Sequence, residues 1–100
     1  MSHRLVVRPE AESDIVEAAL WYEEQRSGLG FEFIAEVRAT VDRVAETPTA
    51  YRLMRRKPEV RRVLLRRFPY RLFYIAQSSE VIVFAVLHAR RRERAWTQRT

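Results

Sequence analysis

The stretch that decides the fold is residues 60–96, VRRVLLRRFPYRLFYIAQSSEVIVFAVLHARRRERAW. Three runs in it are rich in β-branched and aromatic side chains: residues 60–68, 70–76 and 81–87. The links between them are short enough for hairpins, so we expect an antiparallel meander. The last run is apolar at every position, which indicates a central strand covered on both faces. Either the basic C-terminal tail or a partner is expected to cover one face of this sheet, the face opposite the helices that the preceding sequence predicts.

The sequence before this stretch predicts one strand and two helices. A short apolar run at residues 5–7 precedes Pro9, whose fixed φ suits the first turn of a helix over residues 9–26. The Ser27-Gly28-Leu29-Gly30 segment breaks that helix, because glycine can adopt a positive φ. Apolar side chains at spacings of three and four then predict a second helix up to Pro48. Residues 49–59 are expected to form a loop.

The order β-α-α-β-β-β predicts an α+β fold in which a helical hairpin packs on a small, mainly antiparallel sheet. The chain has 100 residues, which is enough for one domain to bury roughly 60–70% of its unfolded surface. We therefore expect a single domain over residues 1–100.

Charge is segregated along the chain. Residues 52–100 hold 14 basic and 3 acidic side chains, a net charge of +11, whereas residues 1–51 hold 5 and 10, a net charge of −5. Such an arrangement indicates an anionic partner, either a nucleic acid or an acidic polypeptide. A genome rich in GC is the alternative source of the many Arg residues.

Several classes of function are disfavoured by composition. The chain has no Cys and only two His, His3 and His88, without metal-ligand spacing. We expect no metal and no cofactor. The first residues lack the apolar core of a signal peptide, and no apolar run approaches the ~20 residues of a membrane span. The protein is expected to be soluble and cytoplasmic, with no membrane partner.

The motifs of the chain resemble those of the RelE/ParE superfamily of bacterial toxins, and most closely its ParE-like, plasmid-stabilisation branch. The resemblance covers nearly the whole chain and depends on these segments in this order: Pro9–Ile15, Trp21-Tyr22-Glu23, Gly28-Leu29-Gly30, Arg67-Phe68-Pro69-Tyr70 and His88-Ala89-Arg90-Arg91. It implies the toxin of a type II toxin-antitoxin pair. The partner would be a cognate antitoxin with a flexible acidic or amphipathic tail, and a homodimer or a toxin-antitoxin hetero-oligomer is possible.

The resemblance leaves two mechanisms open. RelE-type members cleave mRNA on the ribosome, and Arg62, Arg71 and Arg91 match three of their basic catalytic positions. Leu64 stands where those nucleases have a Lys, and Trp96 lies near the place of a Tyr. The ParE branch instead poisons DNA gyrase by protein contact without being an enzyme.

We therefore expect a gyrase inhibitor, with a ribosome-dependent ribonuclease or a non-toxic binding module as alternatives. The residues expected to bind the target or the antitoxin are basic or lie near the C-terminus: Arg61, Arg66, Arg67, His88, Arg90, Arg92, Arg94 and Trp96.

Alternation along a strand sends Arg62 and Arg66 to one face and Arg61 and Arg67 to the other, so these residues cannot all line one site. Some of them are expected only to protect sheet edges. His88 is expected to make local hydrogen bonds, since no catalytic partner is placed beside it. Phe73 and Phe84 are expected in the core, with base stacking as the alternative.

Overall fold

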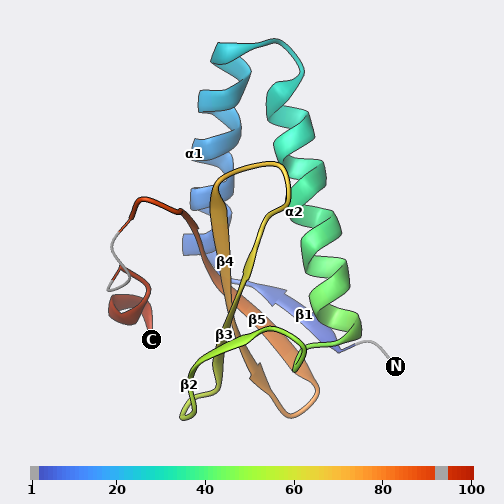
Figure 1. Ribbon diagram of the computed structural model, residues 1–100, viewed down its shortest axis with the longest axis vertical. Helices are drawn as coiled ribbons and strands as arrows, with labels where there is room; N and C mark the ends of the chain where they lie inside the picture. The colour runs from blue at the N-terminus through green and yellow to red at the C-terminus, as the bar shows by residue number, and fades with distance from the viewer. Residues whose placement is uncertain (1–2, 92–94) are drawn as a thin grey trace.

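A computed structural model of the protein describes residues 3–91 and 95–100. The elements follow one another as β1 (Arg4–Val7), α1 (Pro9–Gln25), α2 (Leu29–Glu46), β2 (Arg52–Arg55), β3 (Val60–Leu64), β4 (Tyr70–Gln77), β5 (Glu80–His88) and a short 3-10 helix, η2 (Thr97–Arg99). The predicted α+β fold is confirmed: a helical hairpin lies against one face of a mainly antiparallel sheet (Figure 1). Neither α1 nor α2 is long and apolar enough to cross a membrane.

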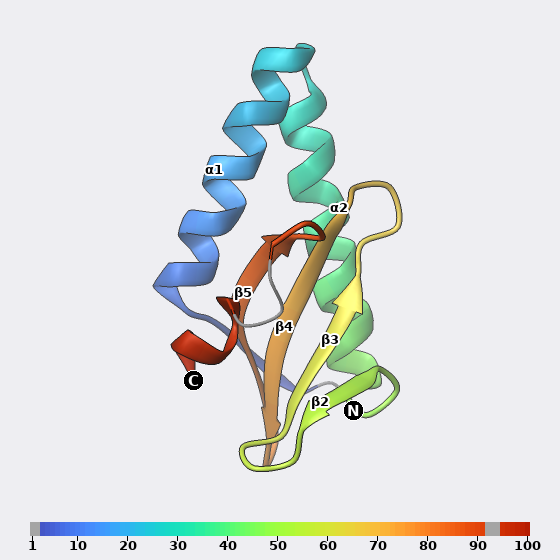
Figure 2. The same ribbon diagram turned by 60° about the vertical axis from the view of Figure 1, so that its left-hand side comes forward.

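The two helices are held together at their glycine turn. Gly28 adopts a φ of +92°, and the Glu23 carboxylate accepts hydrogen bonds from the Gly28 and Gly30 amides at 2.8 and 2.9 Å. A Cβ on Gly30 would lie 2.6 Å from the Ala19 carbonyl oxygen, so the helices cross too closely for any other residue there. The turn end of the hairpin projects beyond the sheet (Figure 2).

The sheet has the strand order β1-β5-β4-β3-β2, with β1 parallel to β5 and the other pairs antiparallel. β5 is thus an interior strand, as its apolar sequence predicts. The prediction of a loop over residues 49–59 is wrong in part, because Arg52–Arg55 forms the edge strand β2. The strand predicted over residues 60–68 was also too long: β3 ends at Leu64, and residues 65–69 form a connection.

Two apolar clusters cover the two faces of the sheet. The helix face packs on α1 and α2 through residues such as Phe33, Leu72 and Tyr74. The opposite face packs Phe73 and Phe84 against Trp96 from the C-terminal segment. A bulge in β5 opposite Phe73 places Phe84 and Ala85 in the same cluster. The C-terminal tail is therefore what covers the second face, and the core positions expected for Phe73 and Phe84 are confirmed.

Candidate functional site

Arg62 and Arg71 lie on the face of the sheet that points away from the helices. Arg62 is the strand partner of Phe73, and Arg71 is the partner of both Leu64 and Leu87. Since side chains paired across strands share a face, Leu64 lies among these Arg residues. Its side chain is 56% exposed. An exposed apolar side chain at the end of β3 therefore lies beside Arg71 on this face.

Trp96 is buried against this same face rather than exposed. Only 6% of Trp96 is accessible, and its ring stacks on Phe73 with centroids 5.8 Å apart. The Arg55 guanidinium lies 5.3 Å from the indole centre and donates a hydrogen bond to Thr100. Trp96 thus holds the C-terminal segment on the sheet, and a partner would contact it only after this segment moved.

The C-terminal segment is fastened at its other end by an ion pair with α1. Arg99 binds both oxygens of Asp14, at 2.6 and 3.1 Å, and donates to the Phe84 carbonyl at 3.2 Å. The Asp14 carboxylate also accepts a hydrogen bond from the Val86 amide at 2.9 Å. These bonds cap the edge of β5 beyond Val83, where β1 no longer pairs with it. The hydrogen bond that Arg99 donates to Asp14 raises the pKa of Arg99.

Three of the expected binding residues make contacts within the protein. Arg61 is largely buried and binds the Glu59 carboxylate and the Tyr51 carbonyl, both at 2.7 Å, which is a structural role. Arg67 is exposed and pairs with Glu32 at 2.7 Å, and this hydrogen bond lowers the pKa of Glu32. The Arg66 amide donates to Glu36 of α2, while its side chain is exposed. Arg66 and Arg67 follow β3, so alternation along a strand does not set their direction.

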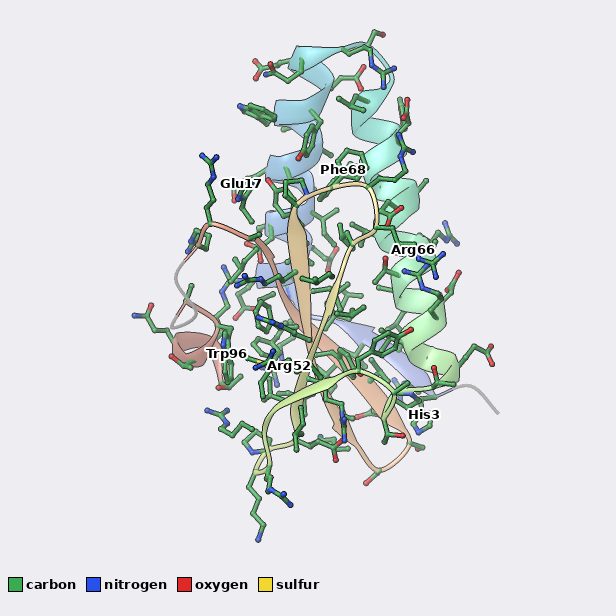
Figure 3. All side chains as sticks on the ribbon, viewed as in Figure 1. His3, Glu17, Arg52, Arg66, Phe68 and Trp96 are labelled. Atoms are coloured by element: carbon green, nitrogen blue, oxygen red, sulfur yellow. The ribbon has the colours of Figure 1, made fainter. Side chains whose placement is uncertain are left out.

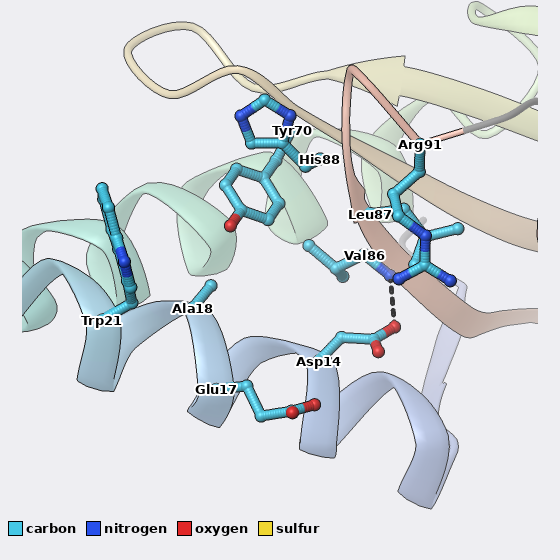
Figure 4. A pocket seen from close by; sticks show the side chains of 9 residues that line it. All are labelled: Asp14, Glu17, Ala18, Trp21, Tyr70, Val86, Leu87, His88 and Arg91. Atoms are coloured by element: carbon cyan, nitrogen blue, oxygen red, sulfur yellow. Dashed lines mark hydrogen bonds between the residues drawn. The ribbon is translucent and has the colours of Figure 1, made fainter.

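A groove of about 280 Å³ lies between α1 and the end of β5 (Figure 4). Its lining combines acidic, basic and aromatic side chains: Asp14, Glu17, Ala18, Trp21, Tyr70, Val86, Leu87, His88 and Arg91. Trp21 is 55% exposed. The Tyr70 and His88 rings meet edge to face at 5.2 Å, and burial raises the pKa of Tyr70. His88 Nδ1 accepts the Arg90 amide at 3.0 Å, a local hydrogen bond of the kind expected.

The structure places two of the three residues that the resemblance assigns to nuclease chemistry on one face of the sheet. Arg62 and Arg71 lie on the face away from the helices, and Arg91 lines the groove together with Leu87, the strand partner of Arg71. Arg90 is exposed next to Arg91. Arg92 and Arg94 lie outside the described residues. Guanidinium groups hold anions but are poor proton carriers, so this arrangement is suited to binding rather than to proton transfer.

One surface was missed from the sequence. Four large apolar side chains are exposed together on the outer side of the hairpin, and we call them the hairpin patch: Val16 (54% exposed), Leu20 (63%), Phe31 (77%) and Ile34 (43%). Leu20, Phe31 and Ile34 border an apolar hollow of about 210 Å³ above Gly30. The available signal was the i, i+4 and i, i+3 spacing of these residues outside the core-facing stripe. Exposed patches of this kind mark interaction sites.

Comparisons with known proteins identify the family. Residues 5–93 match the family model described as "ParE toxin of type II toxin-antitoxin system, parDE". No curated protein sequence matches the chain. The fold is similar to that of a chain in the structure titled "Chromosomal ParDE TA system from P. aeruginosa", with a TM-score of 0.75, 13% identity, and coverage of 87% of this chain and 96% of that chain. Because the family model spans most of the sequence, the chain belongs to the ParE toxin family of type II toxin-antitoxin systems.

Proposed function

We propose that the protein acts in the cytoplasm as a toxin that inhibits DNA gyrase by protein contact, without an enzymatic step of its own. The observation that carries this proposal is the position of Leu64. It is the strand partner of Arg71 and is half exposed, so an aliphatic side chain stands where a nuclease needs a titratable group.

A ribosome-dependent ribonuclease is the second candidate. Arg62 and Arg71 share one face of the sheet, and two guanidinium groups there would stabilise the charge on a phosphate in a transition state. Such an enzyme would have to obtain its general acid and base from the ribosome or the RNA, because Arg does not readily give up a proton. The gyrase proposal requires no such contribution.

Neutralisation by an antitoxin is supported by the hairpin patch. An amphipathic helix of the antitoxin would place apolar anchors on Leu20, Phe31 and Ile34. α1 contains six acidic residues and no Lys or Arg. The helix that docks there should therefore carry basic side chains beside its apolar stripe. Acidic residues of the antitoxin would instead reach the basic C-terminal half of the toxin.

The test is a supercoiling assay with purified gyrase, run beside a cleavage assay on mRNA bound to translating ribosomes. The proposal predicts that the protein inhibits supercoiling at a small molar excess over gyrase and leaves the mRNA intact. Premixing with the product of the adjacent antitoxin reading frame should restore supercoiling. Cleaved mRNA with unaffected supercoiling would favour the ribonuclease, and no effect in either assay would leave a non-toxic binding module.

A further inference from the structure

The edge of β5 that faces α1 is only partly paired. β1 pairs with β5 as far as Val83 and then leaves the sheet for α1. The groove between α1 and the end of β5 lies beyond this point. In Figure 3, Glu17 of the groove stands well above His3, which precedes β1. Within the described residues, the last part of β5 therefore has a neighbouring strand on its β4 side only.

The backbone groups on this open edge follow from the alternation along β5. The Ala89 amide donates to the carbonyl of Pro69, directly before β4, at 2.7 Å, so the groups of Val86 and His88 point away from β4. The Val86 amide shows this direction, because it donates to Asp14 of α1. No described residue bonds the Val86 carbonyl or the His88 amide. One acceptor and one donor thus face the groove.

These two groups define the direction of a strand that would bind them. In a parallel pair, one residue donates to the carbonyl before its partner and accepts from the amide after it, which here makes Leu87 the partner. In an antiparallel pair, one residue of β5 would have to use both of its own groups. The Val86 amide is already bonded to Asp14, and the His88 carbonyl accepts from the Arg91 amide at 2.9 Å. The added strand would therefore run parallel to β5, as β1 does.

The side chains around the groove indicate the chemistry of its occupant. Trp21, Tyr70 and Ala18 provide an aromatic and apolar wall, and Trp21 is 55% exposed. Figure 4 shows the Tyr70 hydroxyl directed toward α1 across the groove. Arg91 lies beyond His88, where a parallel strand has its C-terminal side. An extended peptide with an apolar side chain against Trp21 and a carboxylate near Arg91 would match this arrangement.

We propose that the tail of the antitoxin binds in this groove as a parallel strand, with one residue bonded to the Val86 carbonyl and the His88 amide. This site rests on the proposed neutralisation by an antitoxin, to which it adds the position and direction of the tail. Continuity with the hairpin patch supports this occupant, because Leu20 of the patch is followed directly in α1 by Trp21 of the groove. A helix docked on the patch can continue into the groove as an extended segment.

The experiment is an N-methyl scan of the tail, in which synthetic tail peptides are titrated into the full toxin chain by calorimetry. Each peptide carries one backbone N-methyl group, which removes a single amide donor. Methylation of the residue that bonds the Val86 carbonyl should weaken binding at least about tenfold. Methylation of the residues directly before and after it should weaken binding less than about threefold, because their amides point away from β5.

Two toxin variants test the charge at the end of the groove. Arg91→Gln should weaken binding of the unmodified peptide about threefold to fivefold, as expected for an exposed ion pair. Arg38→Gln, the matched control, removes an exposed charge on α2 and should leave the affinity unchanged.

Hydrogen exchange measured by NMR on the complete toxin-antitoxin complex gives a second readout. The His88 amide should exchange at least about tenfold more slowly in the complex than in the free toxin. The Val86 amide is the internal control, because its bond to Asp14 exists in both states. A spin label at the C-terminal end of the tail should broaden the resonances of Arg91 more than those of Arg8.

The proposal is overturned if the unmodified tail peptide does not bind, if all singly methylated peptides bind alike, or if the spin label broadens Arg8 more than Arg91. An antitoxin that restores supercoiling while the His88 amide exchanges as fast as in the free toxin would overturn this site and leave the proposed neutralisation intact. An antitoxin that neither binds nor restores supercoiling would overturn both.

Discussion

Asp14→Ala should be among the most damaging single substitutions outside the apolar core. Its carboxylate accepts the Val86 amide at 2.9 Å and both Arg99 nitrogens at 2.6 and 3.1 Å. Val86 is 2% exposed, so its amide would be left without an acceptor at a cost of about 1–3 kcal/mol. The ion pair is about one quarter exposed on the Arg99 side, and after screening it adds about 1 kcal/mol. We expect a total loss of about 2–4 kcal/mol.

Two companion variants divide this loss. Asp14→Asn keeps an oxygen for the Val86 amide and loses the charge, and Arg99→Ala removes the ion pair and leaves the amide bond intact. Each should cost only about 1 kcal/mol. The hydrogen bond to Asp14 raises the pKa of Arg99 in the folded protein. The stabilisation from this ion pair therefore persists through neutral pH and is lost only as pH rises through the pKa of Arg99 in the folded protein.

The assay is urea unfolding at pH 7 followed by circular dichroism, with the free energy of unfolding taken from the linear extrapolation. The expected order of destabilisation is Asp14→Ala well above Asp14→Asn and Arg99→Ala. If Asp14→Ala costs less than about 1 kcal/mol, or if Arg99→Ala costs as much, the Val86 amide is not the main reason for the loss.

Three further outcomes are expected. The hydrogen bond from Arg67 lowers the pKa of Glu32 in the folded protein. The stabilisation from this pair is therefore present above the pKa of Glu32 in the unfolded chain and is lost as pH falls through its pKa in the folded protein. Arg67→Ala should raise the Glu32 pKa in an NMR titration. Gly30→Ala forces a Cβ to within 2.6 Å of the Ala19 carbonyl and should cost about 1–3 kcal/mol in urea unfolding. Phe31 is 77% exposed, so Phe31→Asp should change the free energy of unfolding by no more than about 0.5 kcal/mol. The same substitution should weaken antitoxin binding at least about tenfold in calorimetry. An unchanged affinity would show that the hairpin patch is not part of the antitoxin interface.

The helices and the three later strands were predictable because their signals are local. Pro9, the Gly28 turn and the apolar spacing of α2 place each helix to within about two residues, and β4 and β5 follow from their apolar composition. β2 was not predictable, because Arg52-Leu53-Met54-Arg55 has little strand character and depends on its pairing with β3. Residues 65–68 look like a continued strand, yet Leu65 and Phe68 are buried from a connection.

The candidate site was predictable only in part, because its geometry depends on contacts between distant segments. The basic character of the C-terminal half is visible in the sequence, and the meander indicates that Arg62 and Arg71 come close together. No local pattern shows that Trp96 stacks on Phe73, or that Arg99 reaches Asp14 across 85 positions. The hairpin patch was overlooked because Leu20 and Phe31 lie outside the stripes that face the core.

The most direct test of the gyrase proposal is pulse-labelling of DNA and protein synthesis in bacteria during the first minutes after the protein is induced without an antitoxin. Inhibition of gyrase predicts that DNA synthesis falls first, while protein synthesis continues at its initial rate. A fall in protein synthesis that precedes any change in DNA synthesis would contradict the account and make Arg62 and Arg71 candidates for catalysis.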